Sequence, residues 1–247
     1  MSHYDFSAQR LFVETALAPG VEFVPPPEAL NYLLNVLRLR AGDPLLLFNG
    51  RDGEFLAHLA EVTRRAATIR VERLTRAQTL RADLDYCFAP LKQARLDYMA
   101  QKATEMGAGR LTPVITRRTQ ARRVNIARLK ANAVEAAEQC GVLAVPDAAD
   151  AVDLSDFLAA FPPGRLLVFC DEDAPIANPL HALAGRSGHG ISVLVGPEGG
   201  FDDAERAAVT RLPNVARVSL GPRILRADTA AVAALAIVQA TIGDWAC

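Results

Sequence analysis

Two glycine-proline turns near the C-terminus constrain the fold of this chain more than any other feature of its sequence. The first lies in ISVLVGPEGGFDDAE (191–205) and the second in RVSLGPRILRADTAAVAAL (217–235). Each follows a strand-like apolar run and leads into a helical pattern. Loops after parallel strands meet at the carboxyl edge of an α/β sheet, where such folds bind ligands, so the turns predict a site for a small polar molecule. Neither contains a phosphate loop or a Gly-x-Gly-x-x-Gly fingerprint, and a nucleotide-phosphate site is therefore not favoured.

Bulk composition indicates a folded protein without a membrane segment. The 247 residues are 51% apolar, which is enough for one large domain or two smaller ones with a sizeable core. No apolar run reaches the ~20 residues that span a bilayer, and the N-terminus lacks the plan of a signal peptide. We therefore expect a cytoplasmic protein. No metal site is expected either, because no metal-ligand spacing occurs among Cys87, Cys140, Cys170, Cys247, His3, His58, His181 and His189.

Charge is segregated along the chain although the net charge is only −1. Residues 77–130 carry eleven basic and four acidic side chains, whereas residues 131–210 carry three basic and thirteen acidic ones. Most of the basic residues are arginine, which suits bidentate phosphate contacts. The pattern fits either a solvated charged face or a local basic surface that binds nucleic acid.

The first 74 residues predict a small β-rich domain, which we interpret as a barrel. Asn49-Gly50 and Asp52-Gly53 supply turn chemistry between two of its strands. The strands are expected at 10–15, 44–48, 53–62 and 66–74, with one helix at 27–39.

Residues 75–247 predict a separate α/β domain with a parallel sheet, after a polar linker at 75–83. Gly107 is placed to end the first helix, and Asp202 with Glu205 forms a candidate capping box for a helix that continues to Leu212. The last helix is apolar nearly all round, so it should be buried or lie at an interface. Strands are expected at 84–91, 111–115, 165–170, 191–195 and 216–220, and helices at 93–106, 124–140 and 227–243.

Several ordered motifs resemble one known family. They are VLRLRAGD (36–43), LFNG (47–50), KQARLDYMAQKATEMG (92–107), EAAEQCG (135–141), VGPEGGF (195–201) and SLGPRILRADTA (219–230). Together they resemble the bacterial 16S rRNA (uracil-N3)-methyltransferases, the RsmE family of the SPOUT superfamily, over nearly the whole chain.

The resemblance implies both architecture and activity. Residues 1–74 would form a PUA-like β-barrel that binds RNA, and residues 75–247 a SPOUT methyltransferase domain with a trefoil knot. The family uses S-adenosyl-L-methionine, acts as a homodimer, and methylates N3 of the uridine at position 1498 of 16S rRNA, within the 30S subunit. This chain departs from the family at Asn31, at Ala227-Asp228, and at Val142 and Ala144, where family members tend to carry arginines.

The resemblance places the methyl donor in the two glycine-proline turns. The glycines allow close backbone approach to the donor, and apolar side chains would wall its adenine. The predicted donor-binding residues are Leu194, Gly196, Pro197, Glu198, Gly199, Gly200, Leu220, Gly221, Ile224, Leu225, Arg226 and Thr229.

The acceptor chemistry points to a cation near the donor. Uridine N3 carries a proton, so the site needs a base or a positive charge that stabilises the uracil anion. Arg226 is the candidate cation, and its alternative is a salt bridge with Asp228. Glu198 has three alternatives: it accepts a proton, binds ribose hydroxyls, or caps the following helix.

Basic side chains from both halves are the candidate phosphate contacts, with the cluster from Arg117 to Arg123 foremost. Glu138 and Gln139 are candidates for contacting the base edge. The full predicted RNA-binding set is Arg10, Arg38, Arg40, Lys92, Lys102, Arg117, Arg118, Arg122, Arg123, Glu138 and Gln139.

Two alternatives to an rRNA base methyltransferase remain open. One is a related knotted methyltransferase that acts on a ribose hydroxyl or on tRNA. The other is a non-catalytic RNA-binding module that has lost its cofactor.

Overall fold

The computed structural model describes residues 9–63, 66–175, 178–186 and 190–246. Its contacts divide the chain into two compact units, which we treat separately. The first unit comprises the residues up to Leu80 together with Ala137–Val145, and the second comprises Arg81–Ala136 and Pro146–Cys247. His3, His189 and Cys247 lie outside the described ranges.

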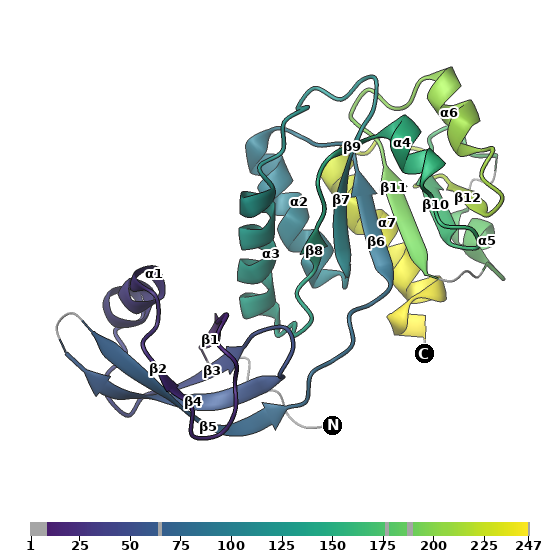
Figure 1. Ribbon diagram of the computed structural model, residues 1–247. Coiled ribbons are helices and arrows are strands. Elements are labelled where there is room, and N and C mark those ends of the chain that lie inside the picture. The colour runs from purple at the N-terminus through teal and green to yellow at the C-terminus, as the bar shows by residue number, and fades with distance from the viewer. Residues whose placement is uncertain (1–8, 64–65, 176–177, 187–189, 247) are drawn as a thin grey trace. The chain divides into compact units, whose positions relative to one another are not determined.

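The first unit is built on a five-stranded sheet in the order β1-β3-β4-β5-β2 (Figure 1). β1 pairs with β3 in parallel, and the other neighbours are antiparallel. One apolar cluster that includes Leu33, Leu47, Leu59 and Ile69 forms its core. The strands are β1 (Arg10–Phe12), β2 (Glu22–Phe23), β3 (Pro44–Phe48), β4 (Glu54–Val62) and β5 (Ala67–Arg76). The predicted β-rich character of this half is confirmed.

The predicted helix at 27–39 is shorter and changes its winding. It runs as α1 (Pro27–Asn31) and continues as a π-helical segment, η1 (Tyr32–Val36). The N–H of Leu37 bonds the carbonyl of Tyr32, which is the i to i+5 spacing of a π-helix. Arg38 then takes a positive φ of 57°, which ends the helix.

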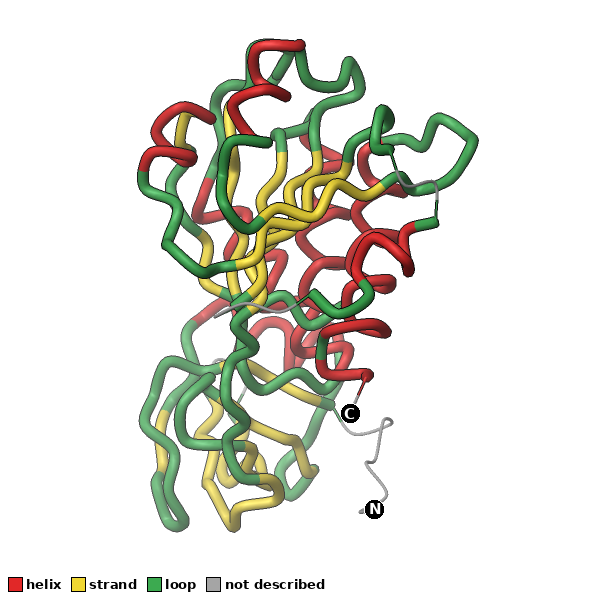
Figure 2. Tube along the Cα trace, turned by 90° about the vertical axis from the view of Figure 1, so that its right-hand side faces the viewer, coloured by secondary structure: helices red, strands yellow, loops and turns green. Residues whose placement is uncertain are grey.

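The second unit contains a parallel sheet in the order β12-β10-β11-β6-β7-β8, and β9 also pairs with β7. Helices lie on both sides of the strands (Figures 1 and 2). The strands are β6 (Leu84–Phe88), β7 (Arg110–Ile115), β8 (Asp147–Ala148), β9 (Val152–Asp153), β10 (Leu166–Cys170), β11 (Ile191–Val195) and β12 (Val215–Val218). The helices are α2 (Gln93–Glu105), α3 (Ile126–Cys140), α4 (Leu154–Ala159), α5 (Pro179–Leu183), α6 (Asp203–Val209), α7 (Ala227–Ile242) and the 3-10 turn η2 (Asp244–Ala246). The end of α3, from Ala137, belongs to the first unit.

Local signals fix several of these boundaries. Asp202 and Glu205 form the predicted capping box, although α6 ends at Val209 and not at Leu212. Gly107 has a φ of 82° directly after α2, as expected of a glycine that ends a helix. Pro179 starts α5, and the side chain of Asn178 accepts a hydrogen bond from the N–H of Leu180.

α7 buries one side against the domain and leaves the other partly exposed. Ala227, Ala230, Ala234, Leu235 and Val238 are among its buried residues. The helix packs against α2, α5 and β11. In the described part of the chain, no helix is long and apolar enough to cross a membrane.

Candidate functional site

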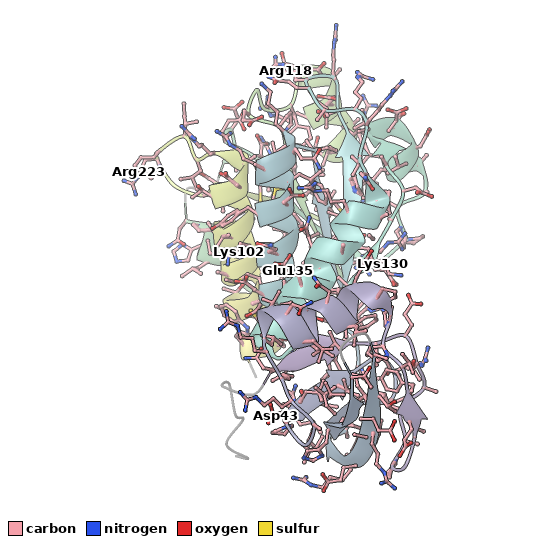
Figure 3. All side chains as sticks on the ribbon, turned by 90° about the vertical axis from the view of Figure 1, so that its left-hand side faces the viewer. Asp43, Lys102, Arg118, Lys130, Glu135 and Arg223 are labelled. Carbon is pink, nitrogen blue, oxygen red and sulfur yellow. The ribbon has the colours of Figure 1, made fainter. Side chains whose placement is uncertain are left out.

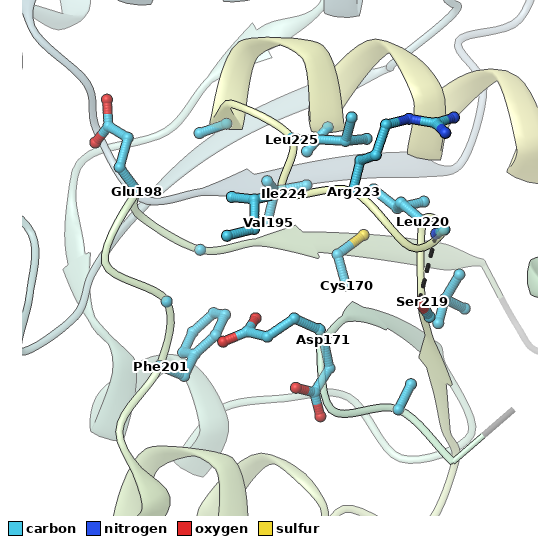
Figure 4. Close-up of a pocket in the computed structure, with 18 of the residues that line it drawn as sticks. Cys170, Asp171, Val195, Glu198, Phe201, Ser219, Leu220, Arg223, Ile224 and Leu225 are labelled. Carbon is cyan, nitrogen blue, oxygen red and sulfur yellow. Dashed lines mark hydrogen bonds between the residues drawn. The ribbon is translucent and has the colours of Figure 1, made fainter. Parts of the chain in front are cut away.

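A cavity of about 770 Å³ lies at the carboxyl ends of three neighbouring strands of the second unit (Figure 4). Its lining includes Cys170 at the end of β10, Val195 at the end of β11 and Val218 at the end of β12. The sequence predicted a site at this edge. The volume falls within the range of pockets that bind small molecules.

The loop after β11 forms one wall of the cavity, and two of its glycines are constrained, Gly196 by packing and Gly200 by its positive φ. A Cβ at Gly196 would lie 2.5 Å from the ring of Phe201, which packs edge-on against Phe169 with ring centroids 4.9 Å apart. Gly200 has a φ of +68°, and a Cβ there would lie 2.7 Å from Oε1 of Glu172. The loop is therefore held close to the residues beneath it.

The loop after β12 forms the opposite wall. Gly221 has a φ of +106°, and a Cβ there would meet no other atom within 4 Å. Glycine is therefore favoured at this position by its backbone conformation and not by crowding. Its N–H lies 3.4 Å from Oγ of Ser219 (Figure 4). Leu220, Ile224 and Leu225 also line the cavity, and the side chain of Ile224 is fully exposed.

A third wall comes from the segment that follows β10. Cys170, Asp171 and Glu172 line the cavity. Burial raises the pKa of the Cys170 thiol to about 12, which keeps it protonated and unsuited to act as a nucleophile. Asp171 is buried and accepts hydrogen bonds from Arg206 at 3.0 Å and from Arg217 at 2.9 Å, so two cations compensate its charge.

Glu198 lines the cavity and is held by an arginine from α2. Nη1 of Arg95 donates to Oε1 of Glu198 at 3.0 Å. Nε of the same arginine lies 3.8 Å from Oδ2 of Asp228, in the first turn of α7. Asp202 and not Glu198 caps α6, so the capping role suggested for Glu198 is wrong.

Arg226 occupies the N-cap position of α7 with an exposed side chain. Its side chain makes no hydrogen bond or ion pair within the described ranges, so the alternative salt bridge with Asp228 does not form. Its neighbours Leu225 and Ala227 line the cavity, whereas Arg226 itself does not.

The loop between β7 and α3 brings basic residues to the first wall. Arg118 donates to the carbonyl of Gly199, and its side chain extends outward from this loop (Figure 3). Arg117 pairs with Asp202 at 3.1 Å while 78% of its side chain stays exposed. Arg122 and Arg123 are exposed as well.

Comparison with known proteins decides the family. Residues 78–239 match an RNA methyltransferase domain, and residues 25–72 match an RNA methyltransferase PUA domain. The chain is 33% identical to ribosomal RNA small subunit methyltransferase E of Rickettsia conorii, over 93% of this chain and 94% of the relative. This chain belongs to the ribosomal RNA small subunit methyltransferase E family.

Solved structures agree with membership of the methyltransferase E family. A putative methyltransferase from Legionella pneumophila, in complex with S-adenosylmethionine, matches with a TM-score of 0.82 and 27% identity. Methyltransferase E of Neisseria gonorrhoeae, bound to S-adenosylmethionine, gives 0.81 and 27%. Both matches cover 94% of this chain and 97% of the other. The predicted fold class, a PUA-like domain with a SPOUT methyltransferase domain, is therefore confirmed.

Most of the predicted donor-binding residues of this family member meet at the cavity, with three exceptions. The residues that line it are Gly196, Pro197, Glu198, Gly199, Gly200, Leu220, Gly221, Ile224 and Leu225. The prediction for Leu194 is corrected. Its side chain is fully buried in a cluster with Phe169 and Val209, because alternate residues of a strand face opposite sides. Arg226 and Thr229 are exposed and outside the lining.

The structure corrects the prediction that Arg10 binds RNA. Its side chain is only 3% exposed, and it donates to Glu54 and to the carbonyls of Glu138 and Val142. A phosphate cannot reach a guanidinium whose donors are already used inside the protein. Glu138 is half-buried and accepts a hydrogen bond from the N–H of Phe12.

The other predicted RNA-binding residues stay at the surface to differing degrees. Lys102 is half-buried, pairs with Glu105 at 2.7 Å and lies over the ring of Tyr98. The exposed members are Arg38, Arg40, Lys92, Arg117, Arg118, Arg122, Arg123 and Gln139.

Sequence reasoning missed the wall after β10 and the role of Arg95. The signal for the wall was present, because Cys170 and Asp171 end a predicted strand just as the two glycine-proline turns do. Arg95 gave no such signal, since its partner Glu198 is 103 residues away in the chain.

Proposed function

We propose that this protein transfers a methyl group from S-adenosyl-L-methionine to N3 of a uridine in 16S rRNA, the uridine at position 1498. The observation that carries this proposal is the cavity at the carboxyl ends of β10, β11 and β12, framed by both glycine-proline loops. Membership of the methyltransferase E family and the two relatives solved with S-adenosylmethionine support it.

The cavity fits a donor that has an apolar ring system and polar edges. Val195, Leu220 and Leu225 supply apolar surface, while the glycine loops leave peptide groups accessible. When bound, the donor supplies a methyl group on a positively charged sulfur. The task left to the protein is mainly to hold this carbon in line with the acceptor nitrogen.

Arg226 stabilises the uracil anion in this proposal. Its guanidinium is exposed and has no acidic partner among the described residues, so its charge is available to a substrate. It also stands at the N-terminus of α7, where unpaired N–H groups and the helix dipole add positive potential. Both effects favour loss of the N3 proton.

Glu198 is held at the cavity by Arg95 and not by a helix N-terminus. Because the capping role is excluded, two of the three roles suggested for Glu198 remain: it binds ribose hydroxyls, or it accepts a proton. Both require a carboxylate that faces the ligand, and Glu198 is part of the lining.

The exposed arginines of the β7–α3 loop are the proposed phosphate contacts nearest the donor. Arg118 contacts the donor loop directly through the carbonyl of Gly199. RNA bound to this arginine cluster would therefore place a base close to the donor loop. We further propose that the enzyme is cytoplasmic, forms a homodimer and acts on 16S rRNA within the 30S subunit.

Mass spectrometry of nucleosides from 16S rRNA tests the function. RNA from cells with and without this gene should differ by one N3-methyluridine, and fragment mapping should place it at position 1498. Appearance of a 2′-O-methyl nucleoside, or a change in tRNA alone, would point to the related knotted enzymes. If the protein binds RNA but no methylated nucleoside depends on it, the remaining alternative is a non-catalytic RNA-binding module.

A further inference from the structure

Among the interactions of the described residues, Arg95 contacts two carboxylates beside the cavity: Glu198 in the loop after β11, and Asp228 in the first turn of α7, the helix into which the loop after β12 leads. Arg95 is the third residue of α2 and is half-buried. It contacts Glu198, which belongs to the loop after β11, at 3.0 Å. It also approaches Asp228, the second residue of α7, at 3.8 Å.

Each of the two loops also has contacts of its own. The first is tied to α6 through the capping box at Asp202 and to the β7–α3 loop through Arg118. Within the second, the N–H of Gly221 lies 3.4 Å from Oγ of Ser219, and the loop continues into α7. Arg95 joins them from a third element, and its guanidinium matches this task because its donors point in fixed and different directions.

Removal of the arginine would leave two carboxylates that repel each other. Glu198 and Asp228 carry the same charge, and Arg95 is the cation that both approach. Their side chains are 42% and 20% exposed, so solvent screens the pair and its contribution to overall fold stability is small. The two contacts connect the loop after β11 with the first turn of α7.

We propose that Arg95 is a positioning residue that holds the two donor-binding loops at a fixed separation and thereby sets the affinity for the methyl donor. The inference rests on the proposed function, because it takes the cavity as the donor site. Arg95 is not assigned a contact with the donor itself.

Calorimetric titration with S-adenosylmethionine tests this role in the full-length protein. Arg95→Gln should weaken donor binding roughly three- to tenfold, the effect of losing one or two partly exposed ion pairs. Arg95→Lys should recover part of the affinity, because lysine keeps the positive charge but lacks the several fixed donors of a guanidinium. The matched control is Arg128→Gln, which removes the ion pair with Asp97 on the outer side of α2 and α3. It should leave the affinity unchanged.

A double-mutant cycle separates positioning from direct contact with the donor. If Arg95 acts through Glu198, then Arg95→Gln should cost less affinity in a Glu198→Gln background than in the wild type. Additive losses would overturn the proposal, since they would show that Arg95 and Glu198 affect donor binding independently of each other. Melting temperatures of all variants should agree with that of the wild type, and a large drop confined to Arg95→Gln and Arg95→Lys would assign the residue to fold stability.

The two proposals fail in different ways. If the wild type does not bind S-adenosylmethionine, the proposed function is wrong. If the wild type binds it and Arg95→Gln binds it equally well, the proposed function stands and the role of Arg95 is wrong.

Discussion

Nε of Arg10 donates to Oε2 of Glu54 at 2.8 Å, and neither side chain is more than 3% exposed. Arg76 reaches the same oxygen at 2.7 Å. The guanidinium of Arg10 also lies 4.3 Å from the centroid of the Phe48 ring. Both arginines donate to carbonyls at and just after the end of α3, including that of Gly141, which Arg76 contacts at 3.0 Å. Glu54 therefore holds two cations that complete the hydrogen bonding of a helix C-terminus.

We expect Glu54→Gln to destabilise the first unit by about 3 kcal/mol, because it leaves a buried guanidinium without its counter-charge. Urea denaturation followed by circular dichroism measures the loss, and hydrogen exchange in β4 locates it. The control is Glu72→Gln in the same sheet, since Glu72 is 51% exposed in its pair with His58. Equal stability of the two variants would contradict a structural role for the buried cluster.

The same cluster predicts acid sensitivity. Burial raises the pKa of Glu54, but its hydrogen bonds and Coulombic attraction to Arg76 and Arg10 outweigh this effect, so the pKa lies below its ordinary value. The unfolded chain then takes up the proton at a higher pH than the folded protein does. Stability from this group should be complete above the ordinary pKa of about 4.3 and fall as the pH drops below it. Glu54→Gln should flatten the slope of unfolding free energy against pH in that range.

Arg226→Ala should lower the single-turnover methylation rate on the order of 10²–10³-fold, because the uracil anion exists only on the way to the transition state. Donor affinity should change little, since Arg226 lies outside the cavity lining. Higher pH should partly restore the rate, as hydroxide then helps to remove the N3 proton. Loss of donor binding, or a rate that pH does not restore, would show that the residue acts otherwise.

Gly221→Val should abolish donor binding while the fold remains largely intact. Its φ of +106° is strained for any β-branched residue, so the loop after β12 must change its path. Gly199→Ala should cost less affinity, because Gly199 needs no positive φ and its new Cβ meets only the flexible side chain of Arg118 at 3.3 Å. Calorimetry with S-adenosylmethionine compares the two, and near-normal affinity of Gly221→Val would remove this loop from the donor site.

The protein should sediment as a dimer at micromolar concentration, with α7 in the interface. Val232 and Ile237 are apolar residues of α7 that stay partly exposed after the buried side has packed. A second copy of the chain would cover them. Ile237→Glu should shift the protein to monomer, whereas Leu180→Glu, at a residue of α5 that is 49% exposed, should not. A wild-type monomer would count against the interface.

Local sequence determined the elements that carry strong periodic or capping signals. β3 and β11 have the bounds that their apolar runs predicted, and the capping box at Asp202 starts α6. The two glycine-proline turns were sufficient to locate the cavity, because a turn after a parallel strand can lie only at the carboxyl edge of the sheet. Short elements such as α4 and β8 were missed, since six or two residues are too few to show a period.

Tertiary structure alone decided what each charged side chain does. Arg10 looked like a surface arginine, but Glu54 is 44 residues away in the chain and the carbonyl of Val142 is 132 residues away, and both meet it inside the first unit. Arg95 gained its partner in the same way, across 103 residues. Periodicity reports which residues share a face of one element, whereas ion pairing depends on which elements pack together. The sequence therefore determined where the site lies, and the packing of distant segments decided which of its charges are free to act.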